Sequence, residues 1–332
     1  MRLALACNRS HLYQPVDGQP EDQFEEFDAP ETVDAIAQTI ASFGHTVEIL
    51  EADHTFPETL KQGMFDVVFN ISEGFRGRCR ESLVPAVCEM LGVPYTGSDP
   101  LTMAISLDKN MAKKVLADKV PVPAGRVFTC AADLERSGAF DDLLFPALIK
   151  PNAEGSSKGI RTFSRVENVS KAREVILWAL KEYRGPALIE EFLPGVECTV
   201  GVVGNQNARV IGMMEIAPKK VSQDQFVYSL ETKRDYKNQV EYRVPPHLPE
   251  STKKEIEEVA LGAFHGLDCR DFSRVDVRLG ADGRPRFIEV NPLPGLSPFK
   301  SDLVILARGM NIEYPELMRM ILDSAFKRLG LA

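Results

Sequence analysis

The sequence predicts an α/β protein with a parallel-sheet, Rossmann-like domain at its N-terminus and α+β architecture in the remainder. Two observations predict this fold class. Short apolar strands alternate with amphipathic helices over the first hundred residues, as in βαβ units. Further on, strands follow one another across short turns, as in antiparallel sheets. A chain of 332 residues has room for two or three such domains.

The composition excludes several classes of protein. Hydrophobic residues make up 44% and charged residues 26%, so global disorder is not expected. The net charge of -9 argues against a nucleic-acid partner, which usually needs a basic face. We expect neither a signal peptide nor a membrane span, because every apolar run is too short. The six cysteines form no C-x-x-C pair, which fits a reducing cytoplasm.

The first domain is expected to cover residues 1–100. Its helix has apolar residues spaced near 3.6, and Gly44 follows it as a plausible C-terminal cap. The segment before that helix is polar and acidic, which predicts a loop. In order, the expected elements are a strand at 2–7, this loop at 10–30, the helix at 31–43, and strands at 45–50 and 65–71.

Two further units are expected, at 101–187 and at 188–332. The first contains helices at 101–119 and 167–183 and a strand at 145–151, and a strand at 186–193 runs across its expected end. The second contains strands at 198–204, 208–216, 274–280 and 285–291 and helices at 250–266 and 313–329. Residues 217–245 lack periodicity and predict a long loop, which is uncommon in a compact domain and often functional.

A hairpin near the C-terminus is expected to bring acidic side chains together. The Asp-Gly pair at 282–283 lies between two alternating runs, which predicts a two-residue turn. With that turn, Asp276 lies opposite Glu289, and Arg274 lies opposite Asn291. All four side chains share one face because the side-chain period of a strand is two.

Two opposed carboxylates repel each other, so this arrangement is reasonable if a cation lies between them. Oxygen donors from Asp276, Glu289 and Asn291 suit Mg²⁺ or Mn²⁺, which also bind substrate phosphates. Pro285 falls at a position that needs no ladder N–H. The alternative interpretation is a solvated surface hairpin with ordinary charges.

A loop of small residues, KPNAEGSSKGI at 150–160, follows a predicted strand. Such a loop lets backbone N–H groups approach phosphate oxygens, with Lys150, Ser156 and Ser157 as added donors. The sequence contains neither G-x-x-x-x-G-K-[ST] nor G-x-G-x-x-G. The alternatives are a plain hairpin loop here and a plain surface lysine at Lys109.

The strand PALIEEFLPGVE ends in closely spaced acids. Its backbone has groups suited to a base, and its carboxylates Glu190, Glu191 and Glu197 have acceptors suited to ribose hydroxyls. The alternative is an edge strand with a charged end.

Four segments together resemble the D-alanine–D-alanine ligases of the ATP-grasp superfamily. They are residues 81–109, 149–160, 188–200 and 274–298, and the resemblance spans about 65–303. It implies an ATP-grasp fold behind a preATP-grasp N-terminal domain. It also implies an ADP-forming C–N ligase that activates a carboxylate as an acylphosphate, with ATP and Mg²⁺ or Mn²⁺, two ions in all, as cofactors.

The resemblance also implies residue roles. The nucleotide contacts are Lys109, Lys150, Ser156, Ser157, Glu190, Phe192, Leu193, Glu197, Lys233 and Ile288. The metal ligands are Asp276, Glu289 and Asn291. The catalytic groups are Arg274, the N–H of Gly295, Lys233 and Ser156. The substrate contacts are Glu81, Arg274, Gly295 and Ser301, although Ser301 is one residue further from Gly295 than in the family.

The substrate side departs from the family pattern. A Gly-Gly-x-Ser-x-Glu-His stretch normally follows the first strand, and its glutamate holds the first D-alanine; here Asp28 and Glu31 are the candidates to replace it. Arg234 stands where a tyrosine is common. ATP-dependent ligation is therefore expected with small amino-acid or carboxylic-acid substrates, in a homodimer. Two alternatives are a ligase for other amino acids or a specialised acid and amine, and a non-catalytic nucleotide-binding regulator.

Overall fold

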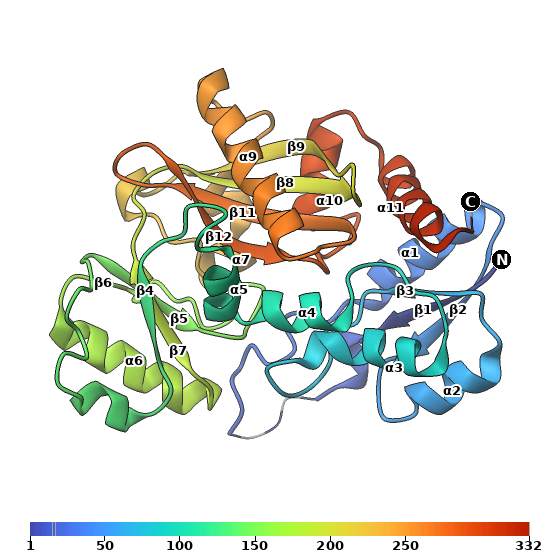
Figure 1. Ribbon diagram of the computed structural model, residues 1–332, viewed down its shortest axis with the longest axis horizontal. Helices are drawn as coiled ribbons and strands as arrows, with labels where there is room; N and C mark the ends of the chain where they lie inside the picture. The colour runs from blue at the N-terminus through green and yellow to red at the C-terminus, as the bar shows by residue number, and fades with distance from the viewer. Residues whose placement is uncertain (15, 17, 332) are drawn as a thin grey trace.

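Three β-sheets, each flanked by helices, make up the computed structural model, which describes residues 1–14, 16 and 18–331. The N-terminal sheet and the middle sheet lie at opposite ends of the molecule, and the largest sheet lies between and above them (Figure 1). No helix of the described part of the chain is both long enough and apolar enough to cross a membrane.

The N-terminal sheet is parallel, as the alternation of strands and helices predicts. Its strands, in spatial order, are β2 (Thr46–Glu51), β1 (Arg2–Cys7) and β3 (Val67–Asn70). Its helices are α1 (Pro30–Ser42), α2 (Phe56–Gly63) and α3 (Leu83–Leu91). The backbone turns after α1 at Gly44, whose φ of +89° is in the left-handed region that favours glycine.

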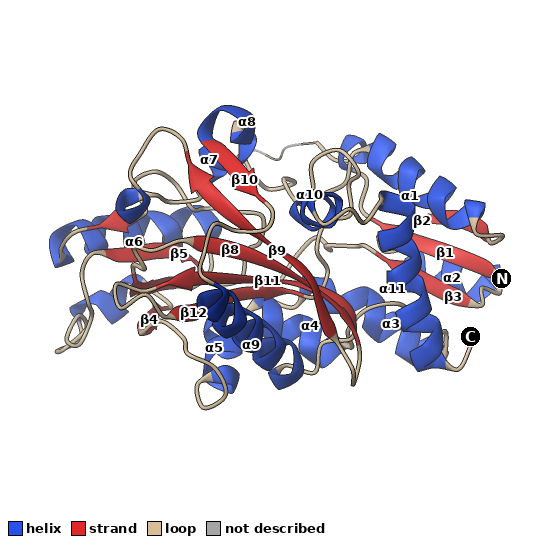
Figure 2. Ribbon diagram, turned by 90° about the horizontal axis from the view of Figure 1, so that it is seen from above, coloured by secondary structure: helices blue, strands red, loops and turns tan. Residues whose placement is uncertain are grey.

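The last helix, α11 (Tyr314–Leu329), completes this first unit. Its buried Leu317 and Ile321 share one core with Leu3 of β1 and Ile36 of α1, and α11 lies beside α1 in both views (Figures 1 and 2). The two ends of the chain are therefore packed together, although the sequence pattern placed this helix only in the last unit.

The middle sheet is antiparallel and is covered by α6 (Val169–Tyr183). Its strands, in spatial order, are β4 (Gly125–Phe128), β7 (Ala187–Glu191), β5 (Ala147–Pro151) and β6 (Arg165–Val166). Buried Ala172, Val175, Ile176 and Ala179 form the sheet-facing stripe of α6, at the spacing of one helical face. Because β7 pairs in this sheet, the sheet extends to Glu191, past the boundary expected at residue 187.

The largest sheet is antiparallel and has helices on both faces. Its strands, in spatial order, are β10 (Val240–Arg243), β9 (Arg209–Pro218), β8 (Glu197–Gly204), β11 (Asp271–Leu279) and β12 (Pro285–Asn291). Alternation along β8 decides what each face contacts. Val200 and Val202 pack with α9 (Glu250–Gly266), whereas Val203 packs with α10 (Asp302–Gly309). Thr199 lies on the same face as Val203, so polar residues near this end of β8 face away from α9.

The single helix expected at 101–119 is wrong: two helices, α4 (Pro100–Leu107) and α5 (Lys109–Leu116), meet at Asp108. Asp108 is extended, and its carboxylate accepts from the N–H of Met111 at 3.0 Å and from Asn152 Nδ2 at 2.7 Å. Asp108 is thus the N-cap of α5 and fastens it to the chain after β5. The break brings the first turn of α5, with Lys109, beside Asn152.

The hairpin of β11 and β12 confirms the expected pairs, Arg274 with Asn291 and Asp276 with Glu289. The expected two-residue turn is wrong, because Gly280 donates to the carbonyl of Arg284 and three residues, 281–283, form the turn. A β-bulge after Asp276 shifts the register by one residue and cancels the difference.

The long loop expected at 217–245 is also partly structured. It contains α7 (Leu230–Arg234), α8 (Tyr236–Gln239) and strand β10. The helices are too short to show a helical period in sequence. We call residues 217–245 the lid, because they lie over the cavity described next.

Candidate active site

A cavity of about 70 Å³ lies between the middle sheet and the largest sheet, under the lid. It is lined by predicted nucleotide and metal residues: Lys109, Lys150, Ser157, Glu190, Phe192, Leu193, Glu197, Lys233, Asp276, Ile288 and Glu289. A second cavity of about 40 Å³ adjoins it and is lined by Glu81, Ser156, Asn291 and Gly295. Lys109, Arg274 and Glu289 line both. A larger hollow of about 870 Å³, beside α11, contains none of the predicted residues.

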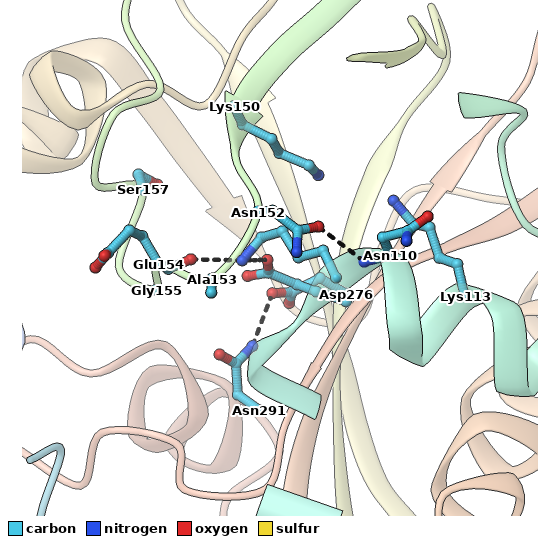
Figure 3. A network of polar contacts seen from close by, with 12 residues as sticks. Asn110, Lys113, Lys150, Asn152, Ala153, Glu154, Gly155, Ser157, Asp276 and Asn291 are labelled. Carbon is cyan, nitrogen blue, oxygen red and sulfur yellow. Dashed lines mark hydrogen bonds and ion pairs between the residues drawn. The ribbon is translucent and has the colours of Figure 1, made fainter. Parts of the chain in front are cut away.

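The two predicted phosphate lysines reach the cavity from different elements. Lys150 ends β5 and pairs with Glu190 at 2.6 Å. Lys109 begins α5 and pairs with Glu289 at 3.1 Å, while its amine also donates to the carbonyl of Glu154. Both lysines are at least nine-tenths buried, so their charges are poorly screened by water. Figure 3 shows Lys150 and the neighbouring loop from close by.

The glycine–serine loop (residues 150–160) has an unusual backbone conformation. Ser156 and Ser157 both have positive φ, of 50° and 60°, which is uncommon outside glycine and clusters at ligand sites. Ser157 Oγ donates to the carbonyl of Tyr228 at 3.2 Å, and the N–H of Leu230 donates to the carbonyl of Ile160. The loop is therefore fastened to the lid.

Apolar and acidic groups from β7 and β8 form the other end of the cavity. Phe192 is buried, and the Arg278 guanidinium lies over its ring at 4.8 Å. Arg278 also pairs with Glu197 at 3.1 Å. Burial raises the pKa of Glu197 despite Arg278. Phe192, Leu193 and Ile288 give this end of the cavity an apolar lining with the Glu197 carboxylate beside it, which suits an adenine ring and a ribose hydroxyl.

The β-bulge decides what β12 contributes. Neighbouring residues of a regular strand point to opposite faces, yet Ile288 and Glu289 both line the larger cavity. The bulge therefore supplies an apolar contact and an acidic one from consecutive positions.

Asp276, Glu289 and Asn291 meet as the hairpin pairing predicts. Asn291 Nδ2 lies 3.4 Å from Asp276 Oδ2 (Figure 3), and Thr199 donates to Asp276 Oδ1 at 2.8 Å. Burial raises the pKa of Asp276, and the charge of Glu289 adds to this effect. Burial opposes ionisation of Glu289 too, but Lys109, Lys150 and Arg274 outweigh it and lower the pKa. These three oxygen-bearing side chains fit a hard divalent cation.

Arg274 lies where the two cavities meet. Its guanidinium pairs with Asp276 at 2.8 Å, Asp302 at 3.5 Å and Glu289 at 3.8 Å. Burial alone disfavours the charged form, but these carboxylates raise the pKa further above its usual value. A permanent positive charge is thus held at fixed geometry beside both cavities, as stabilisation of a developing oxyanion requires.

Gly295 and Ser301 are close together, but only Gly295 lines the smaller cavity. A Cβ added at Gly295 would lie 2.8 Å from Ser301 Oγ, so a larger residue here would have to displace this hydroxyl. Ser301 Oγ accepts from the N–H of Ser297 at 2.9 Å. The serine hydroxyl therefore supports the turn that presents Gly295.

Three carboxylates that sequence reasoning did not group meet in the smaller cavity. Donor atoms of Glu26, Glu73 and Glu81 lie within 4.8 Å of one another. Arg80 and Lys158 both pair with Glu26, each at 2.9 Å. Burial, with neighbouring carboxylates, raises the pKa of Glu73 well above its usual value and that of Glu81 to about 7.

Neither Asp28 nor Glu31, the two candidates considered for the N-terminal acid, lines either cavity; Glu26 does. Glu26 comes from the acidic segment (residues 19–28), whose sequence has several acids and no periodicity to rank them. Its position depends on tertiary contacts with Arg80 and the glycine–serine loop, where the N–H of Gly155 donates to it at 2.8 Å.

Other contributing residues also lacked a motif. Tyr228 and Tyr242 share a hydrogen bond of 2.7 Å beside Asp302, which also pairs with Arg274. Lys113 pairs with Glu190. Only Lys113 has a usable sequence signal, since it follows Lys109 by four positions and so shares its helical face.

Comparisons with known proteins agree with this geometry. The family model "D-ala D-ala ligase C-terminus" matches residues 125–323. The D-alanine–D-alanine ligase of Aquifex aeolicus is 31% identical over 87% of this chain and 92% of its own length. Uncharacterized protein y4sG of Sinorhizobium fredii is 29% identical over 99% and 98%.

The fold comparison gives the same result. The crystal structure of D-alanine–D-alanine ligase from Bacillus anthracis complexed with ATP superposes with a TM-score of 0.75 at 22% identity, over 99% of both chains. The expected ATP-grasp fold is therefore confirmed.

Proposed function

Because this chain belongs to the D-alanine–D-alanine ligase family of ATP-grasp ligases, we propose that it joins the carboxylate of one amino acid to the amine of another. ATP is converted to ADP and phosphate, by way of an acylphosphate. The observation that carries this proposal is Arg274, which pairs with three carboxylates where the cavity under the lid meets the smaller acidic cavity. A nucleotide-binding regulator has no use for such a group.

The proposed roles follow from the chemistry of each position. Lys109 and Lys150 bind the phosphates, and Ser156 and Ser157 cover them through the loop backbone. Phe192, Leu193 and Ile288 contact the base, with Glu190 and Glu197 at its polar edges. Two Mg²⁺ or Mn²⁺ ions held by Asp276, Glu289 and Asn291 would neutralise phosphate charge when bound.

Arg274 and the N–H of Gly295 stabilise the oxyanion formed when the amine attacks. One well-placed donor of this kind contributes about 2.7–4 kcal/mol. Lys233 and the lid exclude water, which would otherwise hydrolyse the acylphosphate. Ser301 acts through Gly295, by holding the turn that presents this N–H.

For the first substrate we propose an acid that carries an ammonium group, with D-alanine as the first compound to test. Glu73 and Glu81 supply carboxylates where that ammonium would lie, beside Glu26, which Arg80 and Lys158 already neutralise. A plain carboxylic acid would bring no cation to Glu73 and Glu81. The departures from the family pattern at the N-terminal stretch and at Arg234 concern this side of the site. We also propose a cytoplasmic homodimer with no nucleic-acid partner.

The test is a screen for phosphate release with ATP and Mg²⁺ across D-alanine, L-amino acids and simple acids. We expect release that requires an amino acid, and at least about a hundredfold lower turnover in Arg274→Ala with ADP binding retained. Turnover with acids that lack an amine, and none with amino acids, would reverse the substrate assignment. Unchanged turnover in Arg274→Ala would contradict the mechanism.

A further inference from the structure

Lys113 is a buried cation that pairs with a nucleotide-site residue without lining the cavity itself. It lies one turn after Lys109 on α5, and its amine contacts Glu190 Oε2. Lys150, from β5, contacts the other oxygen of the same carboxylate at 2.6 Å. The exposed fractions of Lys113, Lys150 and Glu190 are 7%, 2% and 2%. Two lysines from different elements therefore share one buried carboxylate.

Lys150 has two competing partners once a nucleotide binds. Its proposed partner is a phosphate, but in this structure its amine pairs with Glu190. Taking Lys150 away would leave Glu190 buried and unpaired, if it had no other cation. Breaking a buried ion pair in that way is strongly destabilising, because it leaves an uncompensated buried charge. A second cation on Glu190 removes most of this cost.

We propose that Lys113 is a positioning residue that holds the charge of Glu190 and so releases Lys150 to the nucleotide phosphates. The inference rests on the proposed function of the cavity. It assigns to Lys113 a role in nucleotide affinity that requires no contact with the nucleotide.

The charged groups around Lys113 are consistent with this role. Glu190 on β7 faces it, with Lys150 on β5 and Lys109 on its own helix nearby. Burial, opposed by Glu190 and assisted by the two lysines, lowers the pKa of Lys113 to about 8. The two lysines hold the pKa of Glu190 below its usual value, against the effect of burial. Near pH 7, Lys113 and Lys150 are therefore two cations that flank the Glu190 anion.

The experiment measures Mg–ADP affinity of the full chain by isothermal titration calorimetry. Lys113→Met should bind ADP about tenfold or more weakly, since one charged hydrogen bond is at stake. Lys113→Arg keeps the charge and should retain affinity near that of the wild type. Lys114→Met, which removes an exposed lysine from the same helix, is the matched control and should change nothing.

A second arm repeats the Lys113→Met change in a Glu190→Gln background. With no carboxylate to hold, Lys113 should lose its influence, and the double variant should bind ADP as Glu190→Gln does. This arm also decides the matter if Lys113→Met alone does not fold, because the double variant removes one cation and one anion together and keeps the net charge of the Lys113–Glu190–Lys150 cluster unchanged.

The outcomes separate this inference from the function on which it rests. A wild-type protein that binds no ADP would contradict the proposed function. A wild type that binds ADP, with Lys113→Met equally tight, would overturn the role of Lys113. An equal loss from Lys113→Met in both backgrounds would also overturn it, because the effect would not pass through Glu190.

Discussion

Single buried charges decide what this site can do, and their partners come from distant parts of the chain. Arg274 is neighboured by Asp276 on its own strand and by Asp302 at the start of α10. Sequence reasoning found Arg274 and Asp276 because both lie in one short hairpin. It did not find Asp302, since no local spacing relates position 302 to position 274. The same holds for Glu26, which meets Glu81 only in the folded chain.

Asp28 shows how such burial affects stability. Burial raises its pKa from 3.8 to about 7, although Lys300 works against this. Between about pH 4 and pH 7 the folded state holds a proton that the unfolded state has already lost. The free energy of unfolding therefore falls as the pH rises through this range. Asp28→Asn does not titrate, so it should be more stable than the wild type at pH 8, by more than about 1 kcal/mol.

Urea unfolding of the wild type and Asp28→Asn at pH 5 and pH 8 measures this difference. The advantage of Asp28→Asn should be clearly smaller at pH 5 than at pH 8, because between these pH values the unfolded carboxyl is ionised while the folded one loses its proton only near pH 7. A constant difference at both pH values would show that Asp28 does not titrate in this range.

Among the elements, the β11–β12 hairpin shows why sequence reasoning succeeded in part. Alternation and the Asp-Gly pair located both strands and correctly paired Asp276 with Glu289. The pairing was correct because two departures cancelled, a longer turn and a bulge. Strand pattern alone reveals neither, because the bulge places Ile288 and Glu289 on the same side only after the sheet has formed. Likewise, Asp108 divides one expected helix into two through Asn152, a contact across 44 positions.

The turn of this hairpin depends on Gly283, whose φ is +73°. Gly283→Ala should lower the free energy of unfolding by about 1 kcal/mol, because a Cβ disfavours the left-handed region. Nothing lies within 4 Å of the added Cβ, so the cost is backbone strain alone. Gly283→Asn should lose less, since asparagine tolerates this conformation.

Denaturant unfolding of the three proteins provides the measurement, and ADP affinity provides the control. Affinity should stay at the wild-type value, because the turn lies far along the hairpin from Asp276. An alanine variant as stable as the wild type would show that the turn relaxes to another conformation.

At the scale of the whole molecule, most of the strands and helices expected from periodicity formed, with the helix expected at 101–119 divided in two, but their assembly did not follow chain order. The N-terminal sheet shares its core with α11, and the acidic segment crosses to the lid. Hydrophobic period specifies which face of an element is buried and leaves its partner open. The three units expected from sequence therefore group the strands better than they predict which elements share a core, since α11 packs with the first unit.

The cavity under the lid is too small for a nucleotide as it stands. Its volume is about 70 Å³, whereas small-molecule sites usually measure about 300–1,000 Å³. The lid therefore has to open for ATP to enter and for ADP to leave. Ion pairs hold it closed against the acidic segment: Arg234 contacts Glu25 at 2.8 Å and Glu21 at 3.5 Å.

Arg234→Ala should therefore release ADP faster, by roughly two- to fivefold, because exposed ion pairs of this kind contribute about 0–1 kcal/mol each. Stopped-flow release of a fluorescent ADP analogue measures the rate. Raising the salt concentration should speed release from the wild type toward the rate of the variant, since screening weakens the same contacts. Lys220→Ala, at an exposed lysine of the lid, is the matched control. The charge swap Glu25→Arg with Arg234→Glu should restore slow release, and a swapped protein as fast as Arg234→Ala would show that this ion pair does not hold the lid closed.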